Sequence, residues 1–509
     1  MKIKQDSVCH TCRAHKIGCD GKRPTCSQCL MTKRQCGGYQ LDAVFVPYST
    51  KLATRSSRKA LPTRASAKLP SVVYSASCIT DHSILEEGAR DPQKCWIPGL
   101  ISSVTSDEFT AVILNSFVPG DQLNQSSFDS TTSQVCGAWV EILPSLVAQA
   151  QPGGLISLAT RAFGTAILDR SHEGKSKGFR SSEAYIATLH ELKKALLTWK
   201  SSLSIETAAA IVCLAMAELL LPTSNEAMYA HCRGLSALLG SYMPELFSSD
   251  SFHSIFVGCR PVLLFQACDT RKSTFLAQEK WLTIPFRHHP PSDMQKLIGE
   301  AAIIPSIMEE IDLLPSLPHA MAISRAFKAQ DTVSGVLKRL DDWKGRFGRL
   351  TIGPPTGYLQ ILDPDRAHIT ASNIWFPNLL AANVHIHLWA FQIICIAQLE
   401  TLSLYTFGRE GEHETGNPRS YDRNNFRQLS LAAKIRQSVE YLLQDAMKLH
   451  GPAAALFPLK IAYDVFMKDA EGNREHIRHC HKLFDRIYNK GFSKGGASSV
   501  NDGQNTNLT

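Results

Sequence analysis

The sequence predicts a chain in three parts: a small cysteine-rich module of two short helices and loops, a disordered linker, and a large all-α domain. Six cysteines recur at regular spacing near the N-terminus. A basic stretch rich in Ser, Thr and Ala follows, from which no core can form. Farther on, apolar residues recur at steps of three and four, as in amphipathic helices. We therefore expect the module at residues 1–40, the linker at 41–100, the helical domain at 101–492 and a disordered polar tail at 493–509.

The cysteines follow the pattern C-x2-C-x6-C twice, with six residues between the copies, so one eleven-residue unit occurs twice. Cysteines three apart reach one metal ion, and Zn²⁺ takes four ligands. Two ions have eight ligand positions, which six thiolates fill only if two sulfurs bridge. The repeat therefore predicts a metal-stabilised module with one ion and one bridging sulfur per half. The candidate ligands are Cys9, Cys12, Cys19, Cys26, Cys29 and Cys36.

The cysteines allow three other uses. The first residues, MKIKQDSV, lack the apolar segment of a secretion signal, which favours reduced thiols over disulfides. A RING-like module needs eight ligands, and neither His10 nor His15 completes a further C-x2-C pair. A zinc store would not explain the basic residues between the cysteines.

The segment resembles the DNA-binding domain of the fungal Zn2Cys6 binuclear-cluster transcription factors, since all six cysteines and spacings fit and Pro24 stands in the loop between the halves. The resemblance implies two Zn²⁺ bridged by Cys9 and Cys26. It also implies binding to double-stranded DNA at CGG-type triplets, a nuclear location, and control of RNA polymerase II transcription. Metabolic or specialised-metabolite biosynthesis genes are that family's usual targets.

Charge agrees with a nucleic-acid partner. Residues 1–68 hold 14 Lys and Arg against three acids, a net +11, so the remainder carries −3 of the total +8. Such a basic patch neutralises phosphates. In the family, the short helix after the second cysteine reads bases, which here assigns base contacts to Lys16 with His15 beside it. The expected phosphate contacts are Arg13, Lys22, Arg23, Lys33 and Arg34, although one or two of them could instead offset the −2 charge of two Zn²⁺ and six thiolates.

The linker offers three interpretations. Between Lys51 and Lys68 stand six basic residues and no acid, which suits a nuclear localisation signal, an arm on the DNA backbone, or a solvated spacer. Pro47, Pro62 and Pro70 interrupt any zipper, and no seven-residue repeat is sustained. A fragment of residues 1–75 is therefore expected to be a monomer, and any homodimer to form through the helical domain.

Helices are expected at residues 181–199, 204–221 and 225–240, and in a stretch with Val333, Val336, Leu340 and Trp343 on one face. A further amphipathic helix is expected at 432–449, with Gly451 as its stop and Pro452 in the first turn of the next. The uncharged stretch 367–399 reads as a buried core helix and not a membrane span, because it contains many polar amides and histidines. About a dozen helices are expected.

The sequences SVEYLLQ, LFPLKIAYDVF and FDRIYNKGF resemble the helical regulatory domain that follows the cluster in fungal transcription factors. That resemblance implies control of activity, sometimes through a small-molecule effector or a partner. The nine other cysteines form no C-x2-C pair and read as small core residues. His476, His479, Cys480 and His481 offer a weak alternative metal site on a polar helix.

No catalytic motif is found, so we expect no enzyme. The main hypothesis is a sequence-specific DNA-binding regulator. The alternatives are an enzyme with an incidental zinc module, and a zinc-dependent protein-interaction module on a helical ligand-binding protein.

Overall fold

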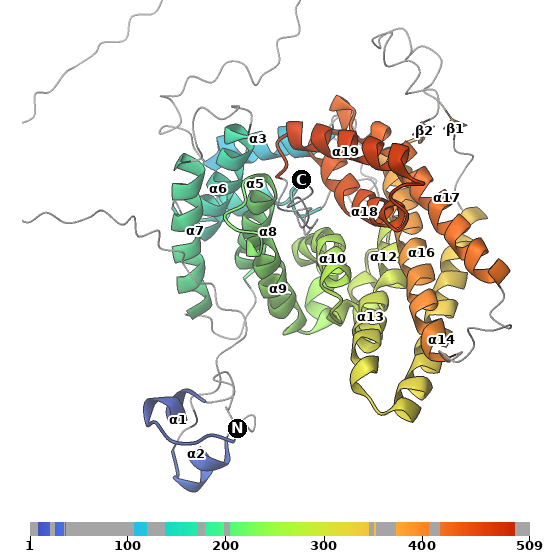
Figure 1. Cartoon of the computed structure of the whole chain (residues 1–509). Coiled ribbons are helices and arrows are strands. Elements are labelled where there is room, and N and C mark those ends of the chain that lie inside the picture. Colours follow the sequence, from blue (N-terminus) through green and yellow to red (C-terminus); the bar gives the residue numbers. More distant parts are fainter. Residues whose placement is uncertain are drawn as a thin grey trace, which may run out of the picture. The chain divides into compact units, whose positions relative to one another are not determined.

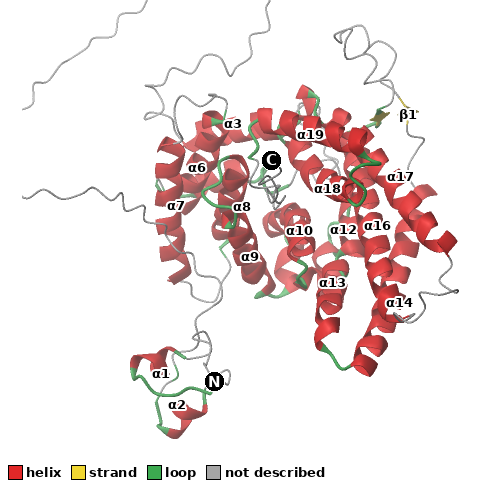
Figure 2. Ribbon diagram, viewed as in Figure 1, coloured by secondary structure: helices red, strands yellow, loops and turns green. Residues whose placement is uncertain are grey.

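The computed structural model contains a cysteine-centred module and a large helical domain, in which helices dominate (Figures 1 and 2). The predicted fold class, a cysteine module followed by an all-α domain, is confirmed. The expected linker and tail lie outside the described residues, apart from Ser493. The structure describes residues 9–20, 26–34, 36, 106–119, 138–151, 153–170, 179–197, 204–345, 351–352, 373–406 and 418–493.

Two short helices, α1 (His10–Ala14) and α2 (Ser27–Met31), form the described part of the module. Both end in the same way. Lys16 and Lys33 adopt left-handed backbone conformations, with φ of 53° and 51°. The amide after each lysine donates to a cysteine carbonyl five residues back, Ile17 to Cys12 at 3.0 Å and Arg34 to Cys29 at 2.9 Å. This is a Schellman ending, repeated because the sequence is repeated.

The helical domain begins with a group of helices that pack on one another through α6 and α8. Ser204 caps α8, accepting from the Thr207 amide at 3.4 Å. Nearly every residue of α8 is buried, so this helix is the centre of the group. The members are α3 (Ser106–Phe117), α5 (Leu143–Gln149), α6 (Leu155–Asp169), α7 (Phe179–Leu197), α8 (Ile205–Leu220) and α9 (Ala227–Gly240).

A second group is built around α16, which packs on α14, α17 and α18. A two-residue antiparallel pair, β1 (Thr351–Ile352) with β2 (Ile374–Trp375), is a small departure from the predicted all-α domain. The helices of this group are α12 (Asp293–Ala301), α13 (Ile304–Leu313), α14 (His319–Asp341), α16 (Leu379–Thr406), α17 (Pro418–Leu442), α18 (His450–Met467) and α19 (Arg474–Asn489).

Helix α10 (Asp250–Thr270) packs on α8 and α9 of the first group and on α12 and α13 of the second. The segment between α9 and α12 also includes α11 (Glu279–Thr283) and short 3-10 turns at Pro244–Ser248, Phe275–Ala277 and Ile284–Phe286. The other short 3-10 turns are Leu314–Ser316, Asp342–Gly345 and Asp445–Met447.

Pro261 stands inside α10 and has no N–H, so the Val257 carbonyl loses its helical donor. The Gln295 side chain of α12 replaces that donor at 2.8 Å, and its own oxygen accepts from Arg260 at 2.7 Å. Arg260 is buried and has no carboxylate partner among the described residues, and the ring centres of Phe256 and Phe286 lie 5.5 and 5.0 Å from its guanidinium. Gln295 thus joins the two helices through polar groups that the proline and the buried cation require.

The C-terminal segments of the helical domain are hydrogen-bonded to its first helices. The Leu449 amide donates to the Ser116 carbonyl at 2.9 Å, and the Ser493 amide donates to the Leu219 carbonyl at 3.2 Å. The Arg170 guanidinium also donates to the Lys490 carbonyl. These contacts connect the C-terminal segments to α3, α6 and α8, so the two helix groups belong to one folded domain.

The predicted buried core helix is confirmed in α16, although it begins at Leu379, where the Asn378 side chain accepts from the Ala381 amide at 2.8 Å. Among the described residues, α16 is the one helix long and apolar enough to cross a membrane, and 94% of its most apolar window is buried within the domain. Each histidine of α16 makes a hydrogen bond through Nδ1 to the carbonyl four residues earlier, His385 to Ala381 and His387 to Asn383, both at 2.7 Å.

The three helices expected at 181–199, 204–221 and 225–240 are confirmed within a few residues as α7, α8 and α9. The single helix expected at 432–449 is wrong: α17 ends at Leu442, and α18 begins at His450. Gly451 is not a helix stop but the place where α18 meets the end of α17. A Cβ there would lie 2.0 Å from the Leu442 carbonyl oxygen, so only glycine fits.

Candidate metal centre and nucleic-acid interface

The six predicted cysteines come together in the module. Four sulfurs, those of Cys9, Cys12, Cys19 and Cys26, all lie within 4.8 Å of one another. A second set of four within the same limit consists of Cys9, Cys26, Cys29 and Cys36. The two sets share Cys9 and Cys26 and no other cysteine.

The spacing of the sulfurs suits zinc. Zn–S bonds of about 2.3 Å in a tetrahedron place neighbouring sulfurs about 3.8 Å apart. The shared pair Cys9–Cys26 is separated by 3.7 Å, Cys9–Cys29 by 3.7 Å and Cys12–Cys26 by 3.6 Å. Cys12 and Cys29, which belong to different sets, are 3.8 Å apart. The sulfurs of Cys9, Cys12, Cys26 and Cys29 are therefore spaced as zinc-bound thiolates are, and all members of each set lie within 4.8 Å of one another.

Backbone amides support the two shared sulfurs in the same way in both halves. The Cys12 amide donates to the Cys9 sulfur, and the Cys29 amide to the Cys26 sulfur, each at 3.3 Å. A hydrogen bond of this kind stabilises negative charge on the accepting sulfur. The two sulfurs common to both sets thus receive equivalent N–H support from α1 and α2.

Burial opposes the charged form of these thiols. It raises the pKa of Cys29 to about 12 and also raises the pKa of Cys9 and Cys12. Thiolate is the zinc ligand, and Zn²⁺ provides the compensating charge that holds the sulfurs deprotonated. The core of the module consists of Cys9, Cys12, Cys26 and Cys29, with Ile17 packed against it. Such a core has almost no apolar area, so metal binding supplies most of its folding free energy.

The basic residues predicted to meet DNA are exposed wherever their side chains are described: His15, Lys16, Lys33 and Arg34. Lys16 and Lys33 occupy equivalent positions after α1 and α2, both with positive φ. A non-glycine residue held in that region is a strain that often marks a functional site. The side chain of Arg13, and Lys22, Arg23 and Pro24 as a whole, lie outside the described residues.

One contact between the halves was missed by the sequence reasoning. The Asp20 carboxylate accepts from the Ser27 amide at 3.0 Å, at the start of α2. Negative charge at a helix N-terminus is stabilising. The spacing of these residues in the sequence carries no signal for the contact.

The remaining described cysteines are buried in helices, as expected for small core residues: Cys213, Cys232, Cys259, Cys268, Cys395 and Cys480. Near the C-terminus, Cys480 is buried, His479 bonds Arg436 at 3.0 Å, and His481 bonds the Tyr463 hydroxyl at 3.1 Å. His476 stacks on Phe466 at 4.6 Å. These side chains contact separate partners. Among the described residues, no group of possible metal ligands is found at this place.

The site and the fold define a class of protein: a binuclear zinc-cluster module joined in one chain to a large helical domain. Residues 7–42 match the model of the fungal Zn(2)-Cys(6) binuclear cluster domain, so the module belongs to that domain family. A domain of this family holds two zinc ions, and the two sets of four sulfurs are compatible with that number.

A stretch of 104 residues is 33% identical to the Aspercryptin biosynthesis cluster-specific transcription regulator atnN of Emericella nidulans. The match covers 20% of this chain and 14% of that relative. The similarity thus spans only a small part of either protein. No solved structure matches the chain.

Proposed function

We propose that Cys9 and Cys26 bridge two Zn²⁺, with Cys12 and Cys19 completing one site and Cys29 and Cys36 the other. Their membership in both sulfur sets supports the bridging role, as do the equivalent amide contacts that each receives.

We infer that the chain is a sequence-specific DNA-binding regulator of RNA polymerase II transcription, acting in the nucleus. The observation that carries this inference is the pairing of an exposed lysine with each half of a binuclear cluster. Lys16, beside His15, is assigned to guanine in a CGG-type triplet, because lysine donates to O6 and N7 in the major groove. The residues assigned to phosphates are Arg13, Lys22, Arg23, Lys33 and Arg34.

The domain limits, the targets and the assembly are part of the same proposal. The DNA-binding domain spans residues 1–40 and the regulatory domain 101–492. The relative's name supports target genes in metabolic or specialised-metabolite biosynthesis. A homodimer would form through the helical domain, which would also receive a small-molecule effector. The transcription-regulator name likewise favours a regulator over an enzyme.

The test compares Lys16→Ala with Lys33→Ala in the full chain, a matched pair because both lysines are exposed and have the same backbone conformation. Fluorescence anisotropy measures binding to CGG-containing and scrambled duplexes across a salt series. Lys16→Ala should lose about 1–3 kcal/mol of discrimination at one triplet. Lys33→Ala should weaken binding to every sequence and lower the salt slope by about 0.9.

Two outcomes would count against this assignment. Unchanged base preference in Lys16→Ala would show that another residue reads the triplet. Absence of DNA binding by the zinc-loaded wild-type chain, with a protein recovered on the module, would favour the alternative of a zinc-dependent protein-interaction module.

A further inference from the structure

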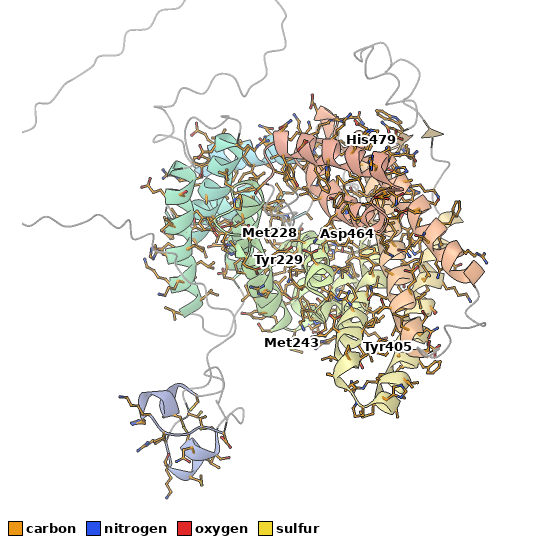
Figure 3. The ribbon with its side chains drawn as sticks, in the orientation of Figure 1. Met228, Tyr229, Met243, Tyr405, Asp464 and His479 are labelled. Atoms are coloured by element: carbon orange, nitrogen blue, oxygen red, sulfur yellow. The ribbon has the colours of Figure 1, made fainter. Side chains whose placement is uncertain are left out.

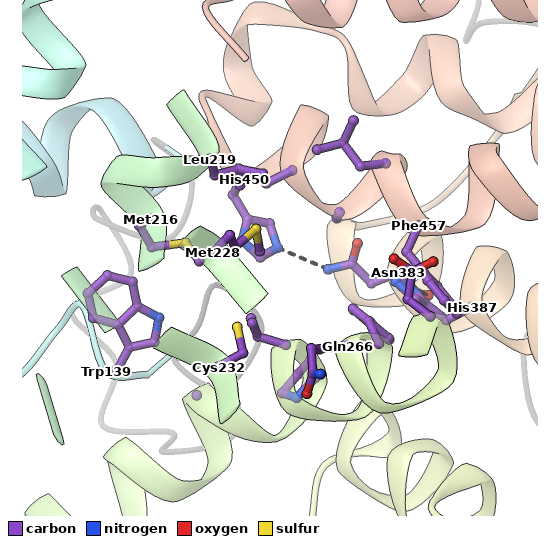
Figure 4. A pocket seen from close by; sticks show the side chains of 18 of the residues that line it. Trp139, Met216, Leu219, Met228, Cys232, Gln266, Asn383, His387, His450 and Phe457 are labelled. Atoms are coloured by element: carbon purple, nitrogen blue, oxygen red, sulfur yellow. Dashed lines mark hydrogen bonds between the residues drawn. The ribbon is translucent and has the colours of Figure 1, made fainter. Parts of the chain in front are cut away.

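A cavity of about 200 Å³ lies inside the helical domain where the two helix groups meet at α10. Its walls are mainly apolar, with Trp139 and Phe457 at opposite ends (Figure 4). Methionines from three helices, Met216, Met228 and Met294, line it. Met228 and Tyr229 lie on the side of α9 that faces the second group (Figure 3). Methionine side chains adapt their shape to a bound molecule at low cost.

One wall of this cavity is polar. On α16, the Asn383 amide nitrogen donates to Nε2 of His450 at 3.1 Å (Figure 4). His387 uses Nδ1 to donate to the Asn383 carbonyl at 2.7 Å, so its Nε2 carries a lone pair. The Asn383 Oδ1 and His387 Nε2 atoms are buried and have no hydrogen-bond partner among the described residues. Both residues line the cavity and are at most 4% exposed.

Two buried acceptors without donors are costly, and native proteins rarely keep them without a reason. A lining residue of α18 carries a further acceptor. Pro458 has no N–H, so the carbonyl of Ala454, which also lines the cavity, lacks its intrahelical donor. At Pro261 of α10, the equivalent carbonyl has a replacement donor in Gln295. On α16, Asn383 Oδ1 and His387 Nε2 therefore offer acceptors that have no donor among the described residues.

The cavity carries no net charge to attract an ion. Burial lowers the pKa of His387 and of His450 to about 4, so both are neutral at physiological pH. The one lysine among the lining residues, Lys460, is paired with Asp269, which also accepts from the Tyr229 hydroxyl. An uncharged molecule suits these walls better than a carboxylate or an amine.

We propose that this cavity binds a neutral, mainly apolar small molecule of one or two rings that carries a hydroxyl or N–H donor. The donor bonds His387 Nε2, and the rings contact the methionines. The size is suitable, because an apolar cavity of about 150 Å³ takes up benzene. A ligand here contacts helices of both groups and stabilises their association. Its effect on transcription rests on the proposed function; its binding does not.

The test uses two probes of nearly equal shape on the full chain: indole, which has an N–H donor, and benzofuran, which has an oxygen in its place. Isothermal calorimetry and the melting temperature report binding. Both probes should bind and raise the melting temperature. Indole should bind up to about tenfold more tightly, the effect of one added hydrogen bond to a buried acceptor.

His387→Phe keeps a ring stacked on Phe265, which lies 4.7 Å from the histidine, but removes the acceptor. This variant should bind benzofuran as before and lose the preference for indole. His385→Phe is the matched control, since His385 makes the same backward bond on α16 but does not line the cavity. It should keep the preference. Met228→Phe, at a half-buried position, narrows the cavity and should weaken the binding of both probes. This variant keeps the proposal testable even if His387→Phe does not fold.

The proposal is overturned if neither probe binds, or if wild type binds both equally. Lys16→Ala separates this result from the DNA-binding proposal. It should leave indole binding unchanged whether or not it alters DNA recognition.

Discussion

The module and the helical domain hold together by different means. The described core of the module is four cysteines, whereas the core of the helical domain is a continuous set of aliphatic and aromatic side chains from nearly every helix. A core of sulfur depends on metal, and a core of apolar area depends on the hydrophobic effect. The comparison teaches that treatments aimed at one part should leave the other intact.

The largest expected effect is loss of zinc. Structural zinc binding is worth roughly 10–16 kcal/mol in small zinc domains. A strong chelator should unfold the module and abolish DNA binding, while the melting temperature of the helical domain stays unchanged. Cys9→Ala should reduce the zinc content from two ions per chain, as measured by atomic emission, because the proposed bridge serves both ions. Cys213→Ala in α8 should still hold two. A chelator that also melts the helical domain would break the comparison.

The next largest effect is expected on the free energy of unfolding, from loss of the Gln295 side-chain hydrogen bonds that link α10 and α12. Gln295→Ala removes the donor for the Val257 carbonyl and the side-chain acceptor for Arg260. The buried carbonyl is then unpaired, and the buried cation keeps only the backbone carbonyl of residue 295, at 3.1 Å, as an acceptor. We expect a loss of about 3 kcal/mol in the free energy of unfolding, measured by denaturant titration. Lys296→Ala, the exposed neighbour on the same helix, should cost less than about 0.5 kcal/mol. Zinc content should not change in either variant.

The neutral histidines of the cavity have a smaller effect, per pH unit, on the free energy of unfolding. Burial lowers the pKa of His387 and His450 to about 4, whereas an unfolded histidine titrates near 6.5. Between these values the unfolded chain binds more protons, so stability falls as the pH falls from about 6.5 to about 4. Each histidine contributes up to about 1.4 kcal/mol per pH unit.

His387→Phe should therefore flatten the pH dependence of the helical domain's unfolding free energy between pH 6.5 and 4.5. The His385→Phe control is informative here too, because burial also lowers the pKa of His385, and its removal should act in the same direction. An unchanged slope in His387→Phe would mean that this histidine titrates normally in the folded chain.

Much of the metal centre follows from the sequence. Spacing alone predicted six ligands in two equal halves, because the chain between ligands three apart is too short to separate them. The helices with continuous apolar faces were predicted for a similar reason, since the 3.6-residue period is a local property of the chain. Where an apolar period crosses a turn, as from Leu442 to Leu449, the sequence does not show the break.

The position of the cavity and the hydrogen bonds between distant helices could be known only from the tertiary structure. Asn383 and His387 read as two polar residues in a buried helix. That Asn383 Oδ1 and His387 Nε2 have no donor among the described residues appears only once α18 and α10 are packed against them. In the same way, Gln295 meets Val257 across 38 positions of sequence. Local periodicity reports which face of a helix is buried, but the identity of the neighbour across that face depends on long-range packing. For that reason the sequence by itself determined the zinc module and the helical class, and the fold determined where an uncharged ligand would fit.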